Sequence, residues 1–409
     1  MKVIKQGKVP IKIWATDIEE SALGQARNLS NLPFVFKHIA LMPDCHFGFG
    51  MPIGGVLAVK NVVIPNAVGV DIGCGMCAVQ TNIKVEDLDT ETIKFVMGEI
   101  RKVIPLGFNH HKTPQEESLM PKIMEADQKS RKKFKEKYPI VSQEYSSALN
   151  QLGTLGGGNH FIEIQKGNDG FIWIMIHSGS RNLGHKVASY YNKLAKELNS
   201  KWASGVPSNW DLAFLPLDTR EAEEYLNEMN YCLEFALANR KLMMDRVKKI
   251  FINVIRKKNG GKLKKHPNYY FGDMINIHHN YATLENHFGE NVMLHRKGAT
   301  KAIKGLKGII PGSQGTCSYI VEGLGNPESF NSCSHGAGRK MGRRDAQRRL
   351  NFEEEKKKLE EKGILHSIRN VSDLDEAPGS YKDIDIVMEN QKDLIKVLVK
   401  LEPLGVIKG

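Results

Sequence analysis

The chain has 409 residues and a formal net charge of +12, and it contains no run of about 18 apolar residues. The sequence therefore predicts no transmembrane helix, and since the N-terminus also lacks the apolar core of a signal peptide, we expect a cytosolic protein. Its six scattered cysteines argue against a disulfide scaffold, and its basic character favours a polyanionic partner such as nucleic acid or a nucleotide.

The first 60 residues are predicted to form short strands around a helix near residues 16–28. They end in a glycine-rich loop, MPDCHFGFGMPIGG, which carries Asp44 and His46. Two interpretations of this pair stay open. The two side chains either support a metal or contact a substrate, or they take part in ordinary turn chemistry.

The stretch AVGVDIGCGMC at residues 67–77 ends an apolar run with Asp71 and Cys74. An oxygen ligand and a sulfur ligand on one loop can both turn toward a metal ion. Cys74 and Cys77 also form a CxxC pair, for which the rival interpretations are a redox pair and half of a zinc site. Because no second CxxC completes a zinc ribbon, the mixed oxygen and sulfur set is favoured.

A helix is predicted over residues 86–101, followed by a polar, basic segment through residue 137. Within it, KSRKKFKEK (129–137) is interpreted mainly as a solvated helix face, with contact to a phosphate backbone as the alternative.

Histidines then stand at the ends of three apolar, strand-like runs. LGGGNHFIEI carries Asn159, His160 and Glu163, WIMIHSGSRNLG carries His177, and INIHHNYA carries His278 and His279. A single histidine at a strand end is most often a hydrogen-bonded structural residue. As a set, repeatedly flanked by glycine and serine, these histidines indicate a functional site.

Helices are predicted over residues 185–200 and 220–258, and an apolar stripe in the second indicates core packing rather than a cofactor site. The basic tract RKKNGGKLKKHP (256–267) is predicted to be a loop that either faces RNA or only aids solubility. The last third returns to strands, and then a charged helix over residues 339–362, a further helix and an apolar strand that stops at Lys408.

A candidate nucleophile, His335, lies in NSCSHGAGR. Its small neighbours leave the imidazole accessible, glycines let backbone N–H groups approach a phosphate, and Arg339 can hold negative charge. The chain contains neither GxxxxGK[ST] nor the Lys-x-Asp-Gly of lysine-adenylating ligases. Metal-assisted phosphoryl transfer through His335 is the chemistry that these observations favour.

The whole chain resembles the RtcB family of GTP-dependent RNA ligases, and most of all its shorter bacterial form. The resemblance rests, in chain order, on MPDCHFGFG, AVGVDIGCGM, LGGGNHFIEI, IHSGSRNLG, HHNYA, PGSQGTCSY, SHGAGR, SYKDID and the terminal VIKG. It implies an enzyme of RNA repair or splicing that joins a 3′-phosphate or 2′,3′-cyclic phosphate end to a 5′-hydroxyl end. It also implies two manganese ions, GTP, a histidine–GMP adduct and an RNA 3′-guanylylated intermediate.

The resemblance also assigns roles to residues of this chain. It implies attack by His335 and metal ligation by Asp71, Cys74, His160, His177 and His279, with Cys74 bridging the two ions. It implies nucleotide contacts from Asn159, Glu163, Asn280, Ser313, Ser318, Ala337, Arg339, Tyr381 and Lys408. Candidates that support the ligands or contact RNA are Asp44, His46, Arg181 and His278. Because zinc would bind this ligand set more tightly, manganese rests on the resemblance alone.

One departure from the family is Gly342, where relatives often carry serine; it leaves the nucleophile in place but puts nearby helix packing or RNA contacts in question. We expect one α+β domain over residues 1–409, with mixed sheets around a central dinuclear site and helices outside. We expect a monomer, with an archease-type activator as a candidate partner.

Two rival functions stay open: a metal-dependent RNA-end phosphodiesterase that forms no adduct on His335, and a non-catalytic RNA-binding paralogue. The natural RNA is also open among tRNA halves, messenger RNA and ribosomal RNA.

Overall fold

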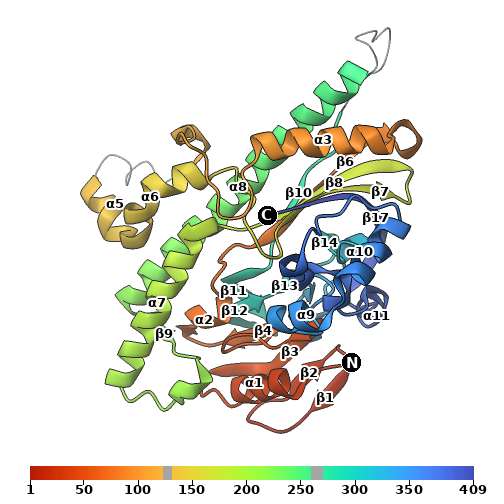
Figure 1. Ribbon diagram of the computed structural model, residues 1–409. Coiled ribbons are helices and arrows are strands. Elements are labelled where there is room, and N and C mark those ends of the chain that lie inside the picture. The colour runs from red at the N-terminus through yellow and green to blue at the C-terminus, as the bar shows by residue number, and fades with distance from the viewer. Residues whose placement is uncertain (123–130, 259–269) are drawn as a thin grey trace.

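The computed structural model describes residues 1–122, 131–258 and 270–409. Two large β-sheets, of which the six-stranded one is mixed, form its centre and helices pack around them, which confirms the predicted α+β class (Figure 1). Most of the predicted loop at 256–267, and residues 129–130 of the basic tract, lie outside the described residues.

The six-stranded sheet has one parallel pair, β2 with β3, and its other pairs are antiparallel. Its strands, in spatial order, are β1 (Lys2–Ile4), β2 (Ile11–Ile13), β3 (Val35–His46), β4 (Ile53–Val59), β12 (Glu290–Lys297) and β11 (Asn280–His287). Strand β3 is apolar throughout its centre because both of its faces are covered. Ile39 and Leu41 point into the core that includes α1 (Glu20–Ser30), whereas Ala40 and Met42 point into another core.

The seven-stranded sheet is antiparallel. Its strands, in spatial order, are β10 (Ile275–His278), β6 (Gly75–Lys84), β8 (Phe171–Ser178), β7 (Phe161–Gly167), β17 (Ile395–Lys408), β15 (Ser318–Gly323) and β14 (Lys307–Ile310). Helices α3 (Thr90–Val103) and α8 (Arg220–Lys258) cover one face (Figure 1). The apolar stripe of α8, which includes Met243 and Phe251, is buried there, so the prediction of core packing is confirmed.

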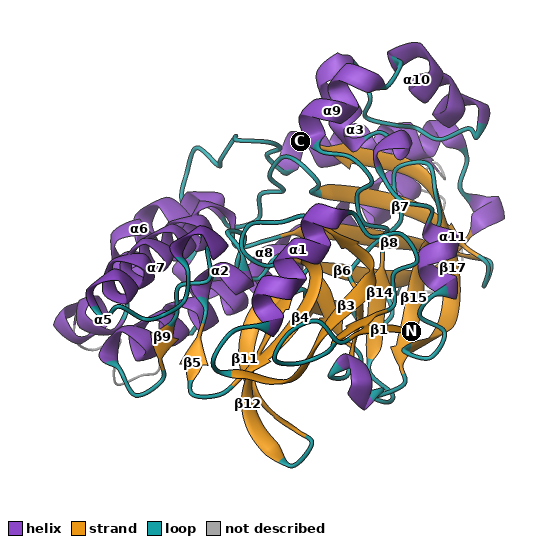
Figure 2. Ribbon diagram, turned by 90° about the horizontal axis from the view of Figure 1, so that it is seen from below, coloured by secondary structure: helices purple, strands orange, loops and turns teal. Residues whose placement is uncertain are grey.

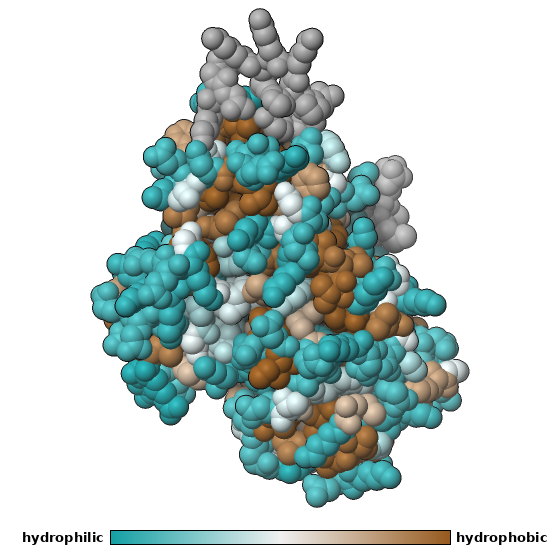
Figure 3. All heavy atoms as spheres, turned by 90° about the vertical axis from the view of Figure 1, so that its right-hand side faces the viewer, coloured by the Kyte–Doolittle hydropathy of each residue, from teal (hydrophilic) through white to brown (hydrophobic). Residues whose placement is uncertain are grey.

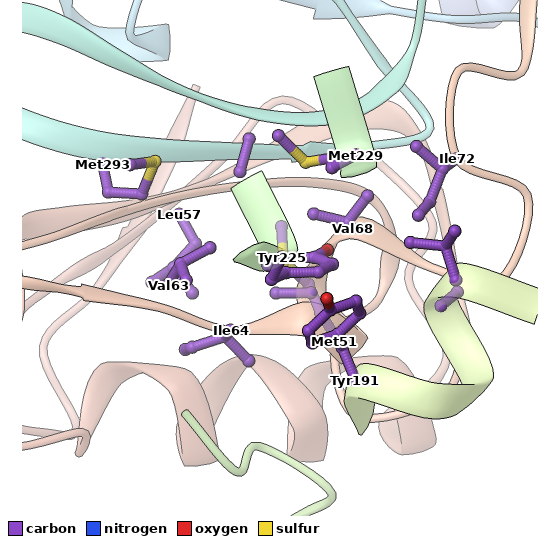
Figure 4. Packing of buried hydrophobic residues seen from close by; sticks show 14 of the residues in the cluster. Met51, Leu57, Val63, Ile64, Val68, Ile72, Tyr191, Tyr225, Met229 and Met293 are labelled. Atoms are coloured by element: carbon purple, nitrogen blue, oxygen red, sulfur yellow. The ribbon is translucent and has the colours of Figure 1, made fainter. Parts of the chain in front are cut away.

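A helical layer packs on the six-stranded sheet through the same core that includes α1. Tyr191 of α7 (Arg181–Lys201) and Tyr225 of α8 pack with their ring centroids 5.2 Å apart, next to Met51 and Val68 (Figure 4). Figure 2 shows the strands between this layer and the group that contains α9 and α10. The remaining elements are α2 (Pro65–Val68), α5 (Arg131–Lys137), α6 (Pro139–Gln151), α9 (Arg343–Arg349), α10 (Phe352–Glu361), α11 (Ile384–Glu389), β5 (Val62–Val63), β9 (Leu215–Pro216), β13 (Ala299–Lys301) and β16 (Ser332–Ser334).

The prediction of one charged helix over residues 339–362 is wrong. The segment contains two helices, α9 and α10, because Leu350 is extended and the side chain of Asn351 caps the second helix by accepting from the N–H groups of Glu353 and Glu354. Helix α8 has the predicted bounds, whereas α1, α3 and α7 differ from the predicted bounds by between one and four residues at their ends.

The surface agrees with the charged composition. In Figure 3, hydrophilic residues cover most of the visible face and separate several hydrophobic patches. Across the described part of the chain, no helix is both long enough and apolar enough to span a bilayer. The basic helix α5 exposes Lys132 and Lys135 and half-buries Phe134, as a solvated helix face does.

Candidate active site

The site begins at one edge of the seven-stranded sheet. Gly75 pairs with His278 on one side and with Ser178 on the other, and Phe161 pairs with His177 and Lys408. Paired residues lie side by side across a sheet, so the neighbouring Cys74, His160 and His279 reach the same edge. The pairing of these strands thus places ligand-type side chains that are far apart in the sequence close together at one edge of the sheet.

An edge of the six-stranded sheet lies next to these ligand-type side chains. His46 pairs with Ile53, and Lys297 lies at the end of β12. Strand β13 follows at once and pairs Ala299 with Ser334, which brings His335 beside Gly298. A Cβ atom on Gly298 would lie 3.0 Å from Cε1 of His335, and its φ of +61° also favours glycine.

The five side chains that the resemblance assigns to metal form two adjoining groups, and Cys74 belongs to both. One group is Asp71, Cys74 and His160; the other is Cys74, His177 and His279. The ligand atoms of each group lie within 4.8 Å of one another. Sγ of Cys74 is 3.4 Å from Nε2 of His160 and 3.2 Å from Nε2 of His177. The geometry therefore offers two cation positions that share one thiol.

Backbone carbonyls fix the orientation of two of these imidazoles. Nδ1 of His160 lies 3.1 Å from the carbonyl oxygen of Leu155, and Nδ1 of His177 lies 3.0 Å from that of Asn159. A carbonyl can only accept, so at His177 Nδ1 carries the proton and the lone pair of Nε2 faces the cluster; at His160, Nδ1 also lies 3.2 Å from a guanidinium nitrogen of Arg181. Burial lowers the pKa of both histidines, which keeps them neutral as metal ligands must be.

His335 is held by the carboxylate of Asp44. Oδ2 of Asp44 accepts from Nδ1 of His335 at 2.6 Å and from the backbone N–H groups of His335 and Gly336 at 3.0 and 3.3 Å. The Asp44 side chain is fully buried. Nε2, the other imidazole nitrogen, has no hydrogen-bond partner among the residues that the structure describes and is available to react. The ring centroids of His335 and His279 are 4.8 Å apart, so the candidate nucleophile adjoins the metal groups.

A pocket of about 210 Å³ opens at His335. It is lined by these predicted site residues: His46, Asn159, Glu163, His177, Ser313, His335, Ala337, Arg339, Tyr381 and Lys408. The structure therefore brings residues from the first and the last parts of the sequence to one cavity.

The sequence is similar over nearly its whole length to proteins of a known family. The sequence model of the family described as "tRNA-splicing ligase RtcB" matches residues 25–409. The chain belongs to the RtcB family. It is 38% identical over 407 residues to RNA-splicing ligase RtcB of Escherichia coli K12, covering 98% of this chain and 97% of the relative. It is 33% identical over 478 residues to tRNA-splicing ligase RtcB of Nanoarchaeum equitans, covering 100% and 97%.

Besides Asp44 and four of the metal-group residues, four further predicted residues of this RtcB-family chain lie outside the pocket lining, and they contact the backbone or side chains of nearby loops. The hydroxyl of Ser318 accepts from the N–H of Gly312, and Asn280 joins the carbonyl of Asp71 to the N–H of Gly298. Arg181 lies 3.2 Å from Nδ1 of His160, and His278 lies 3.2 Å from the carbonyl oxygen of Gly73.

The glycines of LGGGNH are explained by two arginines. Gly156 and Gly158 have φ of +94° and +67°. A Cβ atom at Gly156 would lie 2.2 Å from Nη1 of Arg181, and one at Gly158 would lie 2.7 Å from Nη1 of Arg343. Two guanidinium groups can therefore lie against this turn only because it has no side chains.

Glu376 is a pocket residue that sequence reasoning missed. Its carboxylate lies 2.8 Å from Nζ of Lys408 and 3.1 Å from Nη1 of Arg339, and it accepts the hydroxyl of Tyr381. Burial acts to raise its pKa, but Lys408, Tyr381 and Arg339 outweigh burial and leave the pKa below its usual value. No motif around Glu376 in DLDEAPG separates it from an ordinary surface acid.

Glu163 has a different environment from Glu376. Its carboxylate accepts from the Gln165 amide at 2.6 Å, and burial raises its pKa to about 8, against the opposing effect of Lys408. A carboxyl group with this pKa is largely protonated at neutral pH and can donate as well as accept a hydrogen bond.

A buried arginine, Arg240, supports the metal-site loop and was also missed. Its Nη1 donates to the carbonyl oxygens of Gly73 at 3.0 Å and Ser178 at 2.8 Å. Cys77 lies in β6 within the hydrophobic core and belongs to neither metal group. This placement gives no support to the interpretation of the CxxC as half of a zinc site.

Gly342 lies at the N-cap of α9, where no side-chain cap is made. A serine at this position could accept from the first-turn N–H groups, so glycine leaves this helix end without a side-chain cap while the loop of His335 is intact.

Proposed function

We propose that this chain joins RNA ends carrying a 3′-phosphate or 2′,3′-cyclic phosphate to RNA ends carrying a 5′-hydroxyl, using GTP and two manganese ions. Its relatives are named RNA-splicing and tRNA-splicing ligases, which supports RNA as the substrate. The observation that carries the proposal is the imidazole of His335, oriented by Asp44 and adjoining His279 of the metal groups.

The donor atoms fit two divalent cations. Three neutral imidazoles, one carboxylate and one shared thiol form the two groups, and Nδ1 of buried His279 has no hydrogen-bond partner among the described residues. Asp71, Cys74 and His160 would hold one ion, and Cys74, His177 and His279 the other. Bound ions would supply Lewis-acid neutralisation of phosphate charge. The choice of manganese is part of the proposal.

In the first step, Nε2 of His335 attacks the α-phosphorus of GTP. The nitrogen–phosphorus bond forms as the bond to the bridging oxygen breaks, and pyrophosphate leaves with the electron pair. Asp44 keeps the proton on Nδ1 and stabilises the positive charge that develops on the ring. Arg339, which lines the same pocket, contributes positive charge.

The nucleotide fills the remainder of the pocket in this proposal. Asn159 contacts a phosphate and Glu163 the ribose, while Ser313, Tyr381 and Lys408 form the guanine side. Since Glu376 pairs with Lys408 and Tyr381, we include it among the residues that arrange this side.

An oxygen of the RNA 3′-phosphate then attacks the guanylyl phosphorus and releases His335. The 5′-hydroxyl of the second RNA displaces GMP and forms the new phosphodiester, and a cyclic end is first hydrolysed to the 3′-phosphate. Because all of these steps use one pocket, we also propose that residues 1–409 act as one domain. We further propose a monomeric enzyme located in the cytosol.

Sealing of defined RNA halves tests the proposal. A 3′-phosphate strand and a 5′-hydroxyl strand should yield joined RNA only when GTP and manganese are both present. With a 2′,3′-cyclic phosphate strand in place of the 3′-phosphate strand, opening of the cyclic diester without joining would instead favour an RNA-end phosphodiesterase.

A further inference from the structure

Several exposed aromatic residues lie on loops that adjoin segments lining the pocket. Within residues 1–122, 131–258 and 270–409, five aromatic side chains are more than half exposed: Phe47, Phe49, Phe95, Phe108 and Tyr270. Three of them, Phe47, Phe49 and Phe108, lie on loops that adjoin pocket-lining segments, and we call these three the aromatic rim. Scattered exposed apolar residues are ordinary, but several beside one site indicate a binding surface.

Phe47 and Phe49 lie in the loop between β3 and β4 and are 52% and 72% exposed. His46, just before them, and Ile53, at the start of β4, both line the pocket. The loop is therefore fixed at both ends to the pocket wall, and its two rings lie only a few residues from Asp44.

The backbone of this loop is held in place by buried or partly buried partners. The amide of Gln25 donates to the carbonyl oxygen of Gly48 at 2.6 Å and accepts from its N–H at 3.1 Å. The buried ammonium of Lys297 donates to the carbonyl oxygen of Phe49 at 2.6 Å. These contacts fix the backbone from which the two exposed rings project.

Phe108 is 98% exposed and lies on a turn that packs against another segment of the pocket wall. The N–H of Gly107 donates to the carbonyl oxygen of Gly156 at 3.1 Å, and the N–H of Asn109 donates to that of Leu106 at 3.1 Å. Three residues after Gly156, Asn159 lines the pocket. This ring is thus also presented to solvent by an ordered backbone.

Positive charge lies close to this second segment. Arg343 lines the pocket, its side chain is 49% exposed, and its guanidinium lies against Gly158. Arg343 lies 3.7 Å from Asp375 and 3.8 Å from Glu376, and its exposed part can still face a phosphate. Aromatic rings together with cationic side chains are the usual means by which proteins hold single-stranded nucleic acid, because every base offers a flat face for stacking and every phosphate a negative charge.

We propose that the aromatic rim stacks unpaired bases of the RNA strands that flank the break. The enzyme then takes ends with single-stranded or frayed nucleotides and disfavours blunt duplex ends. This inference rests on the proposed function, since RNA ends at His335 are what bring bases to the rim.

The test uses the full chain with the substitutions F49A and F108A, singly and together, and with F49W and F108W as conservative partners. RNA strands carry 2-aminopurine at the nucleotide nearest the reacting end, because stacking quenches its fluorescence. We expect each alanine variant to lose quenching for at least one strand and to raise the KM for RNA by about tenfold, a typical stacking contribution. The tryptophan variants should restore both.

Tyr190→Ala is the matched control, because Tyr190 is a 45% exposed aromatic residue on α7, outside the pocket lining. Adduct formation with GTP involves no RNA, and it verifies that each variant is folded. If the wild-type enzyme binds RNA but does not seal it, the proposed function is refuted. The quenching of 2-aminopurine fluorescence in the bound RNA would still test the aromatic rim. Unchanged quenching and KM in the double variant would overturn the inference, as would an equal effect of Y190A.

Discussion

The carboxylate of Asp44 lies 2.6 Å from Nδ1 of His335, and the same oxygen accepts the backbone N–H groups of His335 and Gly336. Asp44 ends the apolar part of β3, and His335 follows β16, so the contact joins segments 291 positions apart in the chain. It fixes both the orientation of the ring and the nitrogen that carries the proton.

Replacing Asp44 by Asn should slow formation of the GMP adduct by roughly 10²–10⁴-fold, the range typical for a group that manages a catalytic proton. The amide cannot stabilise the positive ring. The measurement is the single-turnover rate of adduct formation at equal metal content. A rate equal to that of wild type would remove Asp44 from the reaction.

His335→Ala should abolish the adduct but leave the fold and the metal content nearly unchanged, because His335 belongs to neither metal group. The variant should still seal RNA that already carries a 3′-terminal guanylyl group, since that step follows the histidine. Failure on this pre-activated RNA, with metal retained, would contradict the assigned order of steps.

Cys74→Ala should lose metal and activity together, because Cys74 belongs to both metal groups. Cys77→Ala should retain metal and cost about 1 kcal/mol of stability, since its side chain packs in the core. Metal analysis and thermal unfolding measure the two effects. Equal metal loss from both substitutions, with a disulfide after oxidation, would favour a redox pair.

Lys408→Ala should weaken the use of GTP by roughly 1–3 kcal/mol, the value of a hydrogen bond to a charged group. Guanine offers O6 and N7 as acceptors, whereas adenine presents an amino donor in place of O6. ATP use should therefore fall much less. Adduct formation from each nucleotide, at equal metal occupancy, measures the change.

Glu376→Gln is the companion to this variant because it removes the charge that pairs with Lys408 but keeps a similar shape. If Lys408→Ala leaves the preference for GTP over ATP unchanged, Lys408 does not contact guanine. A shift caused by Glu376→Gln alone would assign the preference to the carboxylate.

The sequence predicts the elements with strong periodicity and the residues with distinctive chemistry. Helix α8 has the bounds that its apolar stripe indicates, and Cys74 and His177 meet as the motif pattern suggests. The prediction of one helix over residues 339–362 is wrong because a single asparagine, Asn351, caps the start of a second helix within a charged run.

What the sequence leaves open are contacts that depend on strand pairing between distant segments. The contact between Asp44 and His335 requires β3 and β16 to lie together, so the sequence could not decide between a functional role for Asp44 and turn chemistry. Glu376 shows no local signal, because its importance comes from Lys408 at the far end of the chain.

The central claim is that His335 carries the guanylyl group, and mapping the adduct tests it most directly. Protein incubated with manganese and α-labelled GTP is digested at alkaline pH, where a phosphoramidate survives, and the labelled peptide is sequenced by mass spectrometry. We predict one acid-labile GMP on His335 and none in Asp44→Asn protein at short times. Label on a lysine or another histidine, or sealing of RNA without any protein-bound GMP, would contradict the account.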